Sequence, residues 1–314
     1  MHFLLVGPGA LGCLLSFIIS SGKSSDDRLT LLDYNADRAD CISRNGIRYK
    51  SHDVEHIVQV NAVSAPEAVD AVDVVLLCVK SYHLLDSLEF CRAVLTERTL
   101  LIFLQNGISH LSLEAQLFNA TAAYGTTTEG ATLVNRGHVH HTGRGATHLG
   151  FQAPPEGRFV DLLEKTAQVL HAGGLQVEIT SDIIAKLWAK LFVNVGINAL
   201  SAVLDCNNGE LLTILGAPAR MEKAVNEAVQ VARAYNLPVP PDPWKITQTV
   251  CMNTAENISS MVQDVRNRRR TEIDAINGAV VVLGKNRSIA TPENSTLYEQ
   301  VKALEAGYSP RYTH

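Results

Sequence analysis

Three polar residues recur at helical spacing inside an apolar segment near the middle of the chain. Lys190, Asn194 and Asn198 stand at i, i+4 and i+8, so a helix places them in one stripe. The positions between Leu187 and Ile197 are otherwise almost all apolar, and such a helix is expected to be buried. A buried lysine beside two amides needs an explanation. The alternative is a solvent-facing stripe in which Lys190 extends its ammonium group into water.

A second pair of polar residues, Ser260 and Glu272, lies further along the chain. On one straight helix the twelve intervening steps would separate them by about 18 Å, too far to share a small substrate. If both contact one ligand, the chain must therefore break between them. We expect the break in a basic stretch, and we interpret its arginines as a solvated or ion-paired face rather than a ligand site: Arg266, Arg268, Arg269 and Arg270.

A glycine-rich turn lies at the start of the chain, between an expected strand at 3–6 and an expected helix at 10–20. Its six residues are Gly7, Pro8, Gly9, Ala10, Leu11 and Gly12. The first glycine permits a tight turn, the second lets a pyrophosphate approach the backbone, and the third allows close helix–strand packing. Backbone N–H groups at the helix start would bind the anion. An ordinary strand-to-helix turn is the alternative, and the surrounding pattern makes it the weaker one.

Acidic and polar residues follow other expected strands at the same edge. Asp33 ends the second strand about twenty residues after the turn, where a carboxylate accepts hydrogen bonds from ribose hydroxyls and repels a 2′-phosphate. It therefore favours NAD, although Arg38 lies near enough in sequence to reach a 2′-phosphate, and Asp33 could instead cap a helix beginning near Ala36. Lys80 and Asn106 also follow strands, and each could face a ligand or be an ordinary surface or turn residue.

The alternation of short apolar runs with helical segments predicts an α/β N-terminal domain, a mostly parallel, doubly wound sheet over residues 1–180. The expected strands are Phe3–Val6, Leu29–Asp33, Val74–Val79, Leu100–Leu104, Ala122–Thr126 and Gln176–Ile179. Two segments, 46–61 and 138–151, look like hairpin insertions. Residues 181–314 are expected to form an all-α domain, with helices at Asp182–Val203, Ala217–Tyr235, Thr247–Asn257 and Glu272–Leu283. The proline-rich stretch from Leu237 to Trp244 is expected to break a helix rather than link domains.

Charge and composition exclude several function classes. A net charge of −5 and a pI near 6.1 provide no basic field for nucleic acid, so a small-molecule partner is favoured. Six scattered cysteines indicate reduced thiols in a cytoplasmic protein, and neither a signal peptide nor a membrane span is expected. No metal is expected, because four histidines have irregular spacing and no evident carboxylate partners: His138, His140, His141 and His148.

Taken together, these motifs resemble the ketopantoate reductase (2-dehydropantoate 2-reductase) family from residue 1 to about 305. The segments that carry the resemblance are 7–12, 79–80, 105–107, 125–128, 190–198, 207–211, 259–264 and 271–274. The resemblance implies an N-terminal Rossmann domain that binds dinucleotide, a helical substrate and catalytic domain, and reduction of 2-dehydropantoate to pantoate by NAD(P)H in pantothenate and coenzyme A synthesis.

The resemblance also implies roles for individual residues. Lys190 corresponds to the general acid and Glu272 to the carboxylate that holds the substrate hydroxyl and lies near the cofactor. Lys80, together with Asn106, corresponds to cofactor contacts. The residues implied to position the substrate are Asn106, Asn194, Asn198, Asn208 and Ser260. Burial is expected to depress the pKa of Lys190, and Glu272 to oppose that shift.

Some positions depart from the family pattern. Asp33 stands where many members have a basic residue for the NADP 2′-phosphate, so Asp33 favours NAD while the resemblance favours NADP. Ala199 replaces a usual proline, and His83 a common glutamine. Two alternatives stay open: a reductase of another 2-oxo acid, and a non-catalytic nucleotide sensor. A homodimer is also compatible with the sequence.

Overall fold

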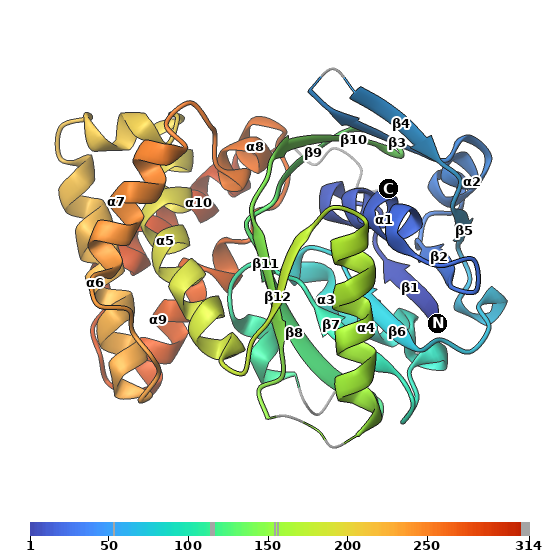
Figure 1. Ribbon diagram of the computed structural model, residues 1–314. Coiled ribbons are helices and arrows are strands. Elements are labelled where there is room, and N and C mark those ends of the chain that lie inside the picture. The colour runs from blue at the N-terminus through green and yellow to red at the C-terminus, as the bar shows by residue number, and fades with distance from the viewer. Residues whose placement is uncertain (53, 114–116, 154, 156, 309–314) are drawn as a thin grey trace. The chain divides into compact units, whose positions relative to one another are not determined.

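The computed structural model describes residues 1–52, 54–113, 117–153, 155 and 157–308. Their contacts divide the chain into two compact units, which Figure 1 shows as a sheet-containing part and a helical part. Unit 1 comprises residues 1–105 and 110–183, and unit 2 comprises residues 106–109 and 184–314. The loop at 106–109 therefore belongs to the helical unit, although it lies in the first half of the sequence.

The main sheet of unit 1 has eight strands in the order β12-β11-β8-β7-β6-β1-β2-β5. Its strands are β1 (His2–Val6), β2 (Arg28–Leu32), β5 (Asn61–Val63), β6 (Val74–Leu77), β7 (Leu100–Phe103), β8 (Thr121–Thr127), β11 (Ala146–Gly150) and β12 (Gln176–Ile179). The β8–β11 pair is antiparallel and the other pairs are parallel. From β5 to β8 this is the Rossmann order, which confirms the predicted fold class.

Both faces of the central strands are buried, which explains their continuous apolar sequences. Phe3 and Leu5 of β1 join one core cluster with helices α1 (Ala10–Gly22) and α4 (Arg158–Ala172), while Leu4 on the opposite face is buried as well. Parallel strands covered on both sides have no polar face to alternate with. Two shorter helices complete the unit: α2 (Ala36–Asn45) and α3 (Leu84–Phe90).

A second sheet of four strands has the order β4-β3-β10-β9 (Figure 1). Its strands are β3 (Ile47–Ser51), β4 (Val54–Val58), β9 (Gly130–Asn135) and β10 (His138–Gly143). The predicted hairpin at 46–61 is confirmed, because β3 pairs with β4 antiparallel. The predicted hairpin at 138–151 is wrong: β10 pairs with β9 and β3, whereas β11 joins the main sheet. Alternation identified the strands, but it does not specify their partners.

Unit 2 consists of helices and connecting loops, with no strand among its described residues. Its helices are α5 (Ile183–Leu204), α6 (Ala217–Ala234), α7 (Pro243–Asn253), α8 (Ser260–Arg266), α9 (Asn277–Asn286) and α10 (Pro292–Ala306). The predicted helix at 247–257 begins earlier, because Asp242 caps it at the Lys245 N–H and Pro243 occupies its first turn. The predicted helix at 272–283 is also corrected: residues 273–275 form a 3₁₀ turn before α9 begins.

Among the described residues, α5 is the one helix long and apolar enough to cross a membrane, with a mean hydropathy of 1.5. Two observations identify it as a core helix instead. Its apolar window is 67% buried inside the protein, and its large side chains Trp188 and Phe192 are both inaccessible. The proline-rich stretch separates α6 from α7 within unit 2, so the prediction that it breaks a helix is confirmed.

Candidate active site

The glycine turn follows β1 directly and opens α1, as predicted. Gly7 has a φ of +95°, and a Cβ there would lie 2.6 Å from Val79 Cγ1. A Cβ on Gly12 would lie 2.0 Å from the Gly7 carbonyl oxygen. Gly9 differs, because a Cβ there meets nothing closer than Cys78 O at 3.9 Å. The fold therefore requires Gly7 and Gly12, whereas Gly9 leaves open the space that an approaching ligand would use.

The start of α1 suits an anion. Gly9 is the N-cap, and it has no side chain that could accept a hydrogen bond from the first-turn amides. This turn lies where the strand order reverses between β1 and β6, the usual ligand position in such sheets. Lys80 lies at the same edge, after β6, and is half-buried. The turn and this edge thus fit a dinucleotide pyrophosphate.

Gln105 organises this edge of the sheet. Its Nε2 donates to Leu77 O at 2.9 Å and to Val79 O at 3.2 Å, so one amide joins the ends of β6 and β7. This role of Gln105 was not predicted, and the only feature of the sequence that pointed to Gln105 is its place in segment 105–107, which resembles the family.

Asp33 follows β2 but is not open to solvent. Its carboxylate is fully buried and forms a bidentate ion pair with Arg38, with Nη2 to Oδ1 at 2.6 Å. Hydrogen bonding to Asp33 raises the pKa of Arg38 further. The helix cap is Asn35, which accepts from the Arg38 N–H at 2.8 Å, so the alternative that Asp33 caps α2 is wrong. Arg38 also lies over the exposed ring of Tyr34, at 5.2 Å from its centroid.

Three of the predicted site residues meet inside unit 2. Lys190 Nζ donates to Asn106 Oδ1 at 2.8 Å, and Asn106 Nδ2 donates to Glu272 Oε2 at 2.9 Å. The Asn106 amide therefore joins the ammonium group to the carboxylate. An amide can do this only with its oxygen toward lysine and its nitrogen toward glutamate, which fixes its orientation.

Burial lowers the pKa of Lys190 to about 8, and the charge of Glu272 opposes the shift. Both directions were expected from the sequence. Glu272 itself is only 5% exposed, and its carboxylate keeps a polar partner in Asn106. An ammonium group whose pKa lies near neutrality transfers a proton more readily than an ordinary lysine.

Close backbone packing explains why Asn106 lies beside Glu272. Gly107 has a φ of +80°, and a Cβ there would lie 2.0 Å from the Ala275 carbonyl oxygen. The next residue, Ile108, donates its N–H to the same oxygen at 3.4 Å. The loop at 106–109 thus packs on the 3₁₀ turn that follows Glu272. Only glycine permits this approach.

The stripe on α5 continues beyond Lys190. Asn194 is half-buried and Asn198 is buried, and both lie on the Lys190 side of the helix by spacing. One turn further, Ser201 Oγ lies 2.9 Å from Ser259 Oγ, which caps α8 at the Val262 N–H. Ser260, the first residue of α8, is exposed. These contacts attach the start of α8 to α5.

The expected break between Ser260 and Glu272 is confirmed. α8 ends at Arg266, and Arg268 has a φ of +51°. Arg266 pairs with Asp205 at 2.7 Å and Arg270 with Asp274 at 3.2 Å, as the interpretation of an ion-paired face predicted for these two.

Comparisons with known proteins show which family the chain belongs to. Residues 3–153 match the family described as "Ketopantoate reductase PanE/ApbA", and residues 182–305 match "Ketopantoate reductase PanE/ApbA C terminal". The 2-dehydropantoate 2-reductase of Halobacterium salinarum is 31% identical over 310 residues, 97% of this chain and 99% of that protein. The one from Streptococcus pyogenes serotype M6 is 31% identical and covers 98% of both. The chain belongs to the ketopantoate reductase family.

Solved structures agree with this membership. The ketopantoate reductase family protein from Ralstonia eutropha has a TM-score of 0.88 and 28% identity, covering 98% of this chain and 99% of that one. D-mandelate dehydrogenase, solved with NADH and anilino(oxo)acetate, has a TM-score of 0.89 and 27% identity over the same shares. Ketopantoate reductases and this dehydrogenase are NAD(P)-dependent oxidoreductases, which agrees with the fit of the glycine turn to a dinucleotide.

Asn208, which the family resemblance placed at the substrate, has protein partners in the structure. Its Nδ2 donates to Thr254 Oγ1 at 2.9 Å, and its N–H donates to Asn257 O at 2.9 Å. Asn208 is buried between the end of α5 and the end of α7. These contacts hold the Asn208 backbone and amide nitrogen, and its place at the substrate stays a prediction.

Two of the four histidines, His141 of the second sheet and His148 of the main sheet, have carboxylate partners that the sequence did not reveal. His141 Nε2 lies 2.5 Å from Glu129 Oε2, and its Nδ1 lies 2.9 Å from Tyr49 OH, all three being buried or nearly so. His148 faces Glu178 at 3.2 Å. Within the described ranges, no three His, Cys, Asp or Glu side chains are grouped to hold a metal ion.

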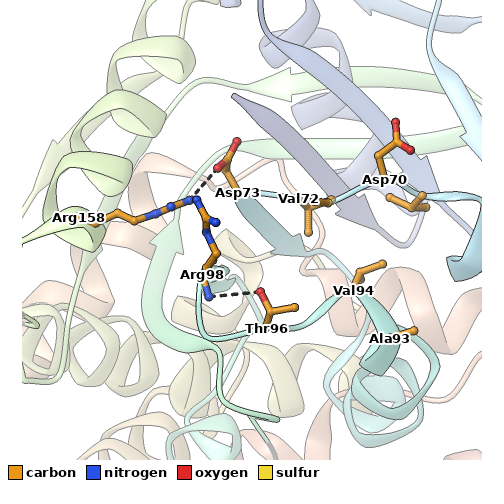
Figure 2. A pocket seen from close by; sticks show the side chains of 10 residues that line it. Asp70, Val72, Asp73, Ala93, Val94, Thr96, Arg98 and Arg158 are labelled. Atoms are coloured by element: carbon orange, nitrogen blue, oxygen red, sulfur yellow. Dashed lines mark hydrogen bonds and ion pairs between the residues drawn. The ribbon is translucent and has the colours of Figure 1, made fainter.

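A cavity of about 400 Å³ lies elsewhere in unit 1, and Figure 2 shows its lining. Arg158 donates to Asp73 Oδ1 at 2.8 Å there, and Arg98 lies close by. Because Asp73 precedes β6, this cavity is at the amino ends of the strands. It is therefore at the edge opposite the glycine turn, and it is not the candidate active site.

Proposed function

We propose that this chain reduces 2-dehydropantoate to pantoate in the cytoplasm, with a hydride from a nicotinamide cofactor. The hydrogen-bonded set of Lys190, Asn106 and Glu272 carries the proposal, because it holds an acid of lowered pKa beside a buried carboxylate. Relatives about 30% identical over their whole length, which bear the name 2-dehydropantoate 2-reductase, support the choice of substrate.

The proposed chemistry balances with one hydride and one proton. A bound NAD(P)H supplies the hydride to the ketone carbon of the substrate. The carbonyl electron pair then moves to oxygen, and Lys190 donates the proton that converts the developing alkoxide to a hydroxyl. Lys190 is left neutral and regains a proton from solvent. Its ammonium group also stabilises negative charge before the transfer.

Neighbouring side chains would bind and orient the substrate. Glu272 would accept a hydrogen bond from the substrate hydroxyl, while Asn106 would hold the carboxylate and Lys190 through its two hydrogen bonds. Asn194, Asn198 and Ser260 supply polar groups along α5 and at the start of α8. The turn at 7–12 and Lys80 would hold the cofactor, and the family resemblance adds Asn106 and Glu272 as cofactor contacts.

For the cofactor we propose a preference for NADH over NADPH. The Asp33 carboxylate neutralises Arg38 through a bidentate pair, so the strand end offers little net positive charge to a 2′-phosphate. The similar D-mandelate dehydrogenase was solved with NADH. Replacing Asp33 with Asn should free Arg38 and shift the ratio of kcat/KM values toward NADPH about tenfold. Replacing Arg38 with Ala should not.

A second candidate is reduction of another 2-oxo acid, favoured by the likeness to D-mandelate dehydrogenase. The fold alone does not select between these substrates. Comparing kcat/KM for ketopantoate and for phenylglyoxylate, the 2-oxo acid corresponding to mandelate, separates them.

The decisive experiment is ketopantoate-dependent oxidation of NADH and NADPH, measured side by side. Lys190→Ala should abolish turnover while nucleotide binding stays nearly intact, and Lys223→Ala, an exposed lysine on α6, is the matched control. Nucleotide binding without turnover of any 2-oxo acid would instead establish a sensor. Unchanged kcat in Lys190→Ala would refute Lys190 as the acid.

A further inference from the structure

The residues on both sides of Glu272 are held by the last helix. Thr271 is fully buried, and both its N–H and its Oγ1 donate to Glu305 Oε1, at 2.7 and 2.8 Å. Two donors from one residue to one carboxylate oxygen fix the backbone as well as the side chain. Thr271 Oγ1 in turn accepts the Ile273 N–H at 3.2 Å. The position of residue 271 is therefore set by α10.

Asp274 provides the second attachment. Its Oδ1 accepts from Tyr298 OH at 3.0 Å, and its Oδ2 faces Lys302 Nζ at 3.4 Å. Burial raises the pKa of Asp274, but hydrogen bonds from Arg270 and Tyr298 outweigh it and lower the pKa overall. Lys302 Nζ also pairs with Glu305 Oε2 at 2.8 Å. Tyr298, Lys302 and Glu305 stand at i, i+4 and i+7, on one face of α10.

Glu272 lies between these two attachments. Its carboxylate points to Asn106, and its carbonyl oxygen accepts the N–H groups of Ala275 and Ile276 at 3.0 and 3.2 Å. The contacts at 271 and 274 attach both sides of Glu272 to α10, in addition to the 3₁₀ turn and its packing against the loop at 106–109. We propose that Thr271 and Glu305 are positioning residues, through which α10 directs the Glu272 carboxylate toward Asn106 and Lys190.

This inference rests on the proposed function for its kinetic consequences, but not for its structural one. Glu272 raises the pKa of Lys190 against the effect of burial. If Glu272 moves away, Lys190 loses this support and its pKa falls further. A purely structural role for Thr271 would change stability and leave that pKa unchanged.

The test compares Thr271→Val, which keeps shape but loses the hydroxyl, with Thr271→Ser, which restores it. Glu299→Gln, an exposed residue of the same helix, is the control. Thr271→Val should lower kcat about tenfold, with KM for the cofactor within about twofold, and move the basic limb of the kcat profile down by about half a pH unit. Thr271→Ser should restore both properties, and Glu299→Gln should change neither.

The pKa of Lys190 is also measured without turnover, by pH-dependent acetic anhydride labelling and mass spectrometry of the Lys190 peptide. A downward shift in Thr271→Val, absent in Thr271→Ser and Glu299→Gln, supports the inference even if ketopantoate is not the substrate. An unchanged pKa in Thr271→Val overturns it, whatever the activity. If Thr271→Val does not fold, Glu305→Ala removes the acceptor of the same hydrogen bonds. A lowered pKa of Lys190 in that variant then supports the inference, and an unchanged pKa overturns it.

Discussion

Lys190 and Asn106 are 84 positions apart in the sequence, yet Lys190 Nζ donates to Asn106 Oδ1 at 2.8 Å. The other end of the same amide donates to Glu272. Proton donor and carboxylate are thus coupled through one neutral side chain, which separates opposite charges without leaving either unpartnered. This arrangement permits Lys190 to stay charged although its half-buried ammonium group is desolvated.

Replacing Asn106 tests this coupling. Asn106→Asp would place a second carboxylate against Glu272, and two neighbouring carboxylates cannot both ionise at ordinary cost. We expect kcat to fall about 100-fold in Asn106→Asp and about tenfold in Asn106→Ala, measured by steady-state NADH oxidation. Equal activity of both variants and the parent would show that Asn106 does not connect the two groups. Asn45→Asp, at an exposed position on α2, is the control.

The pH dependence of kcat should report Lys190. Because the acid must be protonated before the hydride arrives, and its pKa is lowered to about 8, kcat should be constant below this value. Above it, kcat should fall about tenfold per pH unit. Stopped-flow rates between pH 6 and about pH 10 in a buffer of constant ionic strength provide the measurement. A limb near the ordinary lysine value would contradict the lowered pKa.

The charge of Lys190 should also lower the free energy of unfolding. Its folded pKa lies below the ordinary value of 10.5, so below pH 8 the folded state bears the cost of a buried charge. Between these two values the unfolded chain holds more protons, and stability therefore rises with pH until the cost has gone. Lys190→Met should accordingly stabilise the protein by about 1–2 kcal/mol at pH 7, after the loss of one hydrogen bond to Asn106. In urea titrations, this advantage should vanish above pH 10.

Alanine substitutions at Gly12 and Gly9 should impair different properties, stability and cofactor binding. Gly12→Ala brings a Cβ within 2.0 Å of the Gly7 carbonyl oxygen, so it should lower the melting temperature by about 10 °C or prevent folding. Gly9→Ala has room within the protein, so it should fold normally and lose about 100-fold in NADH affinity. Calorimetry and fluorescence titration measure the two effects. Tight NADH binding by Gly9→Ala would place the dinucleotide elsewhere.

The fold was predictable because its signals are local. The continuous apolar strands, the glycine turn and the polar stripe of α5 are each determined by a short stretch of sequence. Strand partners are not local, which is why β10 and β11 were predicted as one hairpin although they lie in different sheets. β9, which pairs with β10, has the sequence Gly-Ala-Thr-Leu-Val-Asn, whose alternation is too weak to predict a strand.

The site was predictable only in part. The stripe from Lys190 to Asn198 follows from helical spacing alone, but Asn106 and Glu272 entered through the family resemblance. These two residues are 166 positions apart, and no sequence pattern joins them. Likewise, the sequence does not predict the ion pair between Arg38 and Asp33, because the Arg38 side chain could equally extend into solvent.

The loop at 106–109 has a consequence for recombining this chain with its relatives. A cut near residue 183 looks natural for exchanging halves between two enzymes, since the sheet ends there and α5 begins. Such a chimera would take Asn106 and Gly107 from one parent, but Glu272 and Ala275 from the other. Three-segment crossovers that move residues 106–109 together with 184–314 would keep the parental pairing, and a library built that way should contain more active clones.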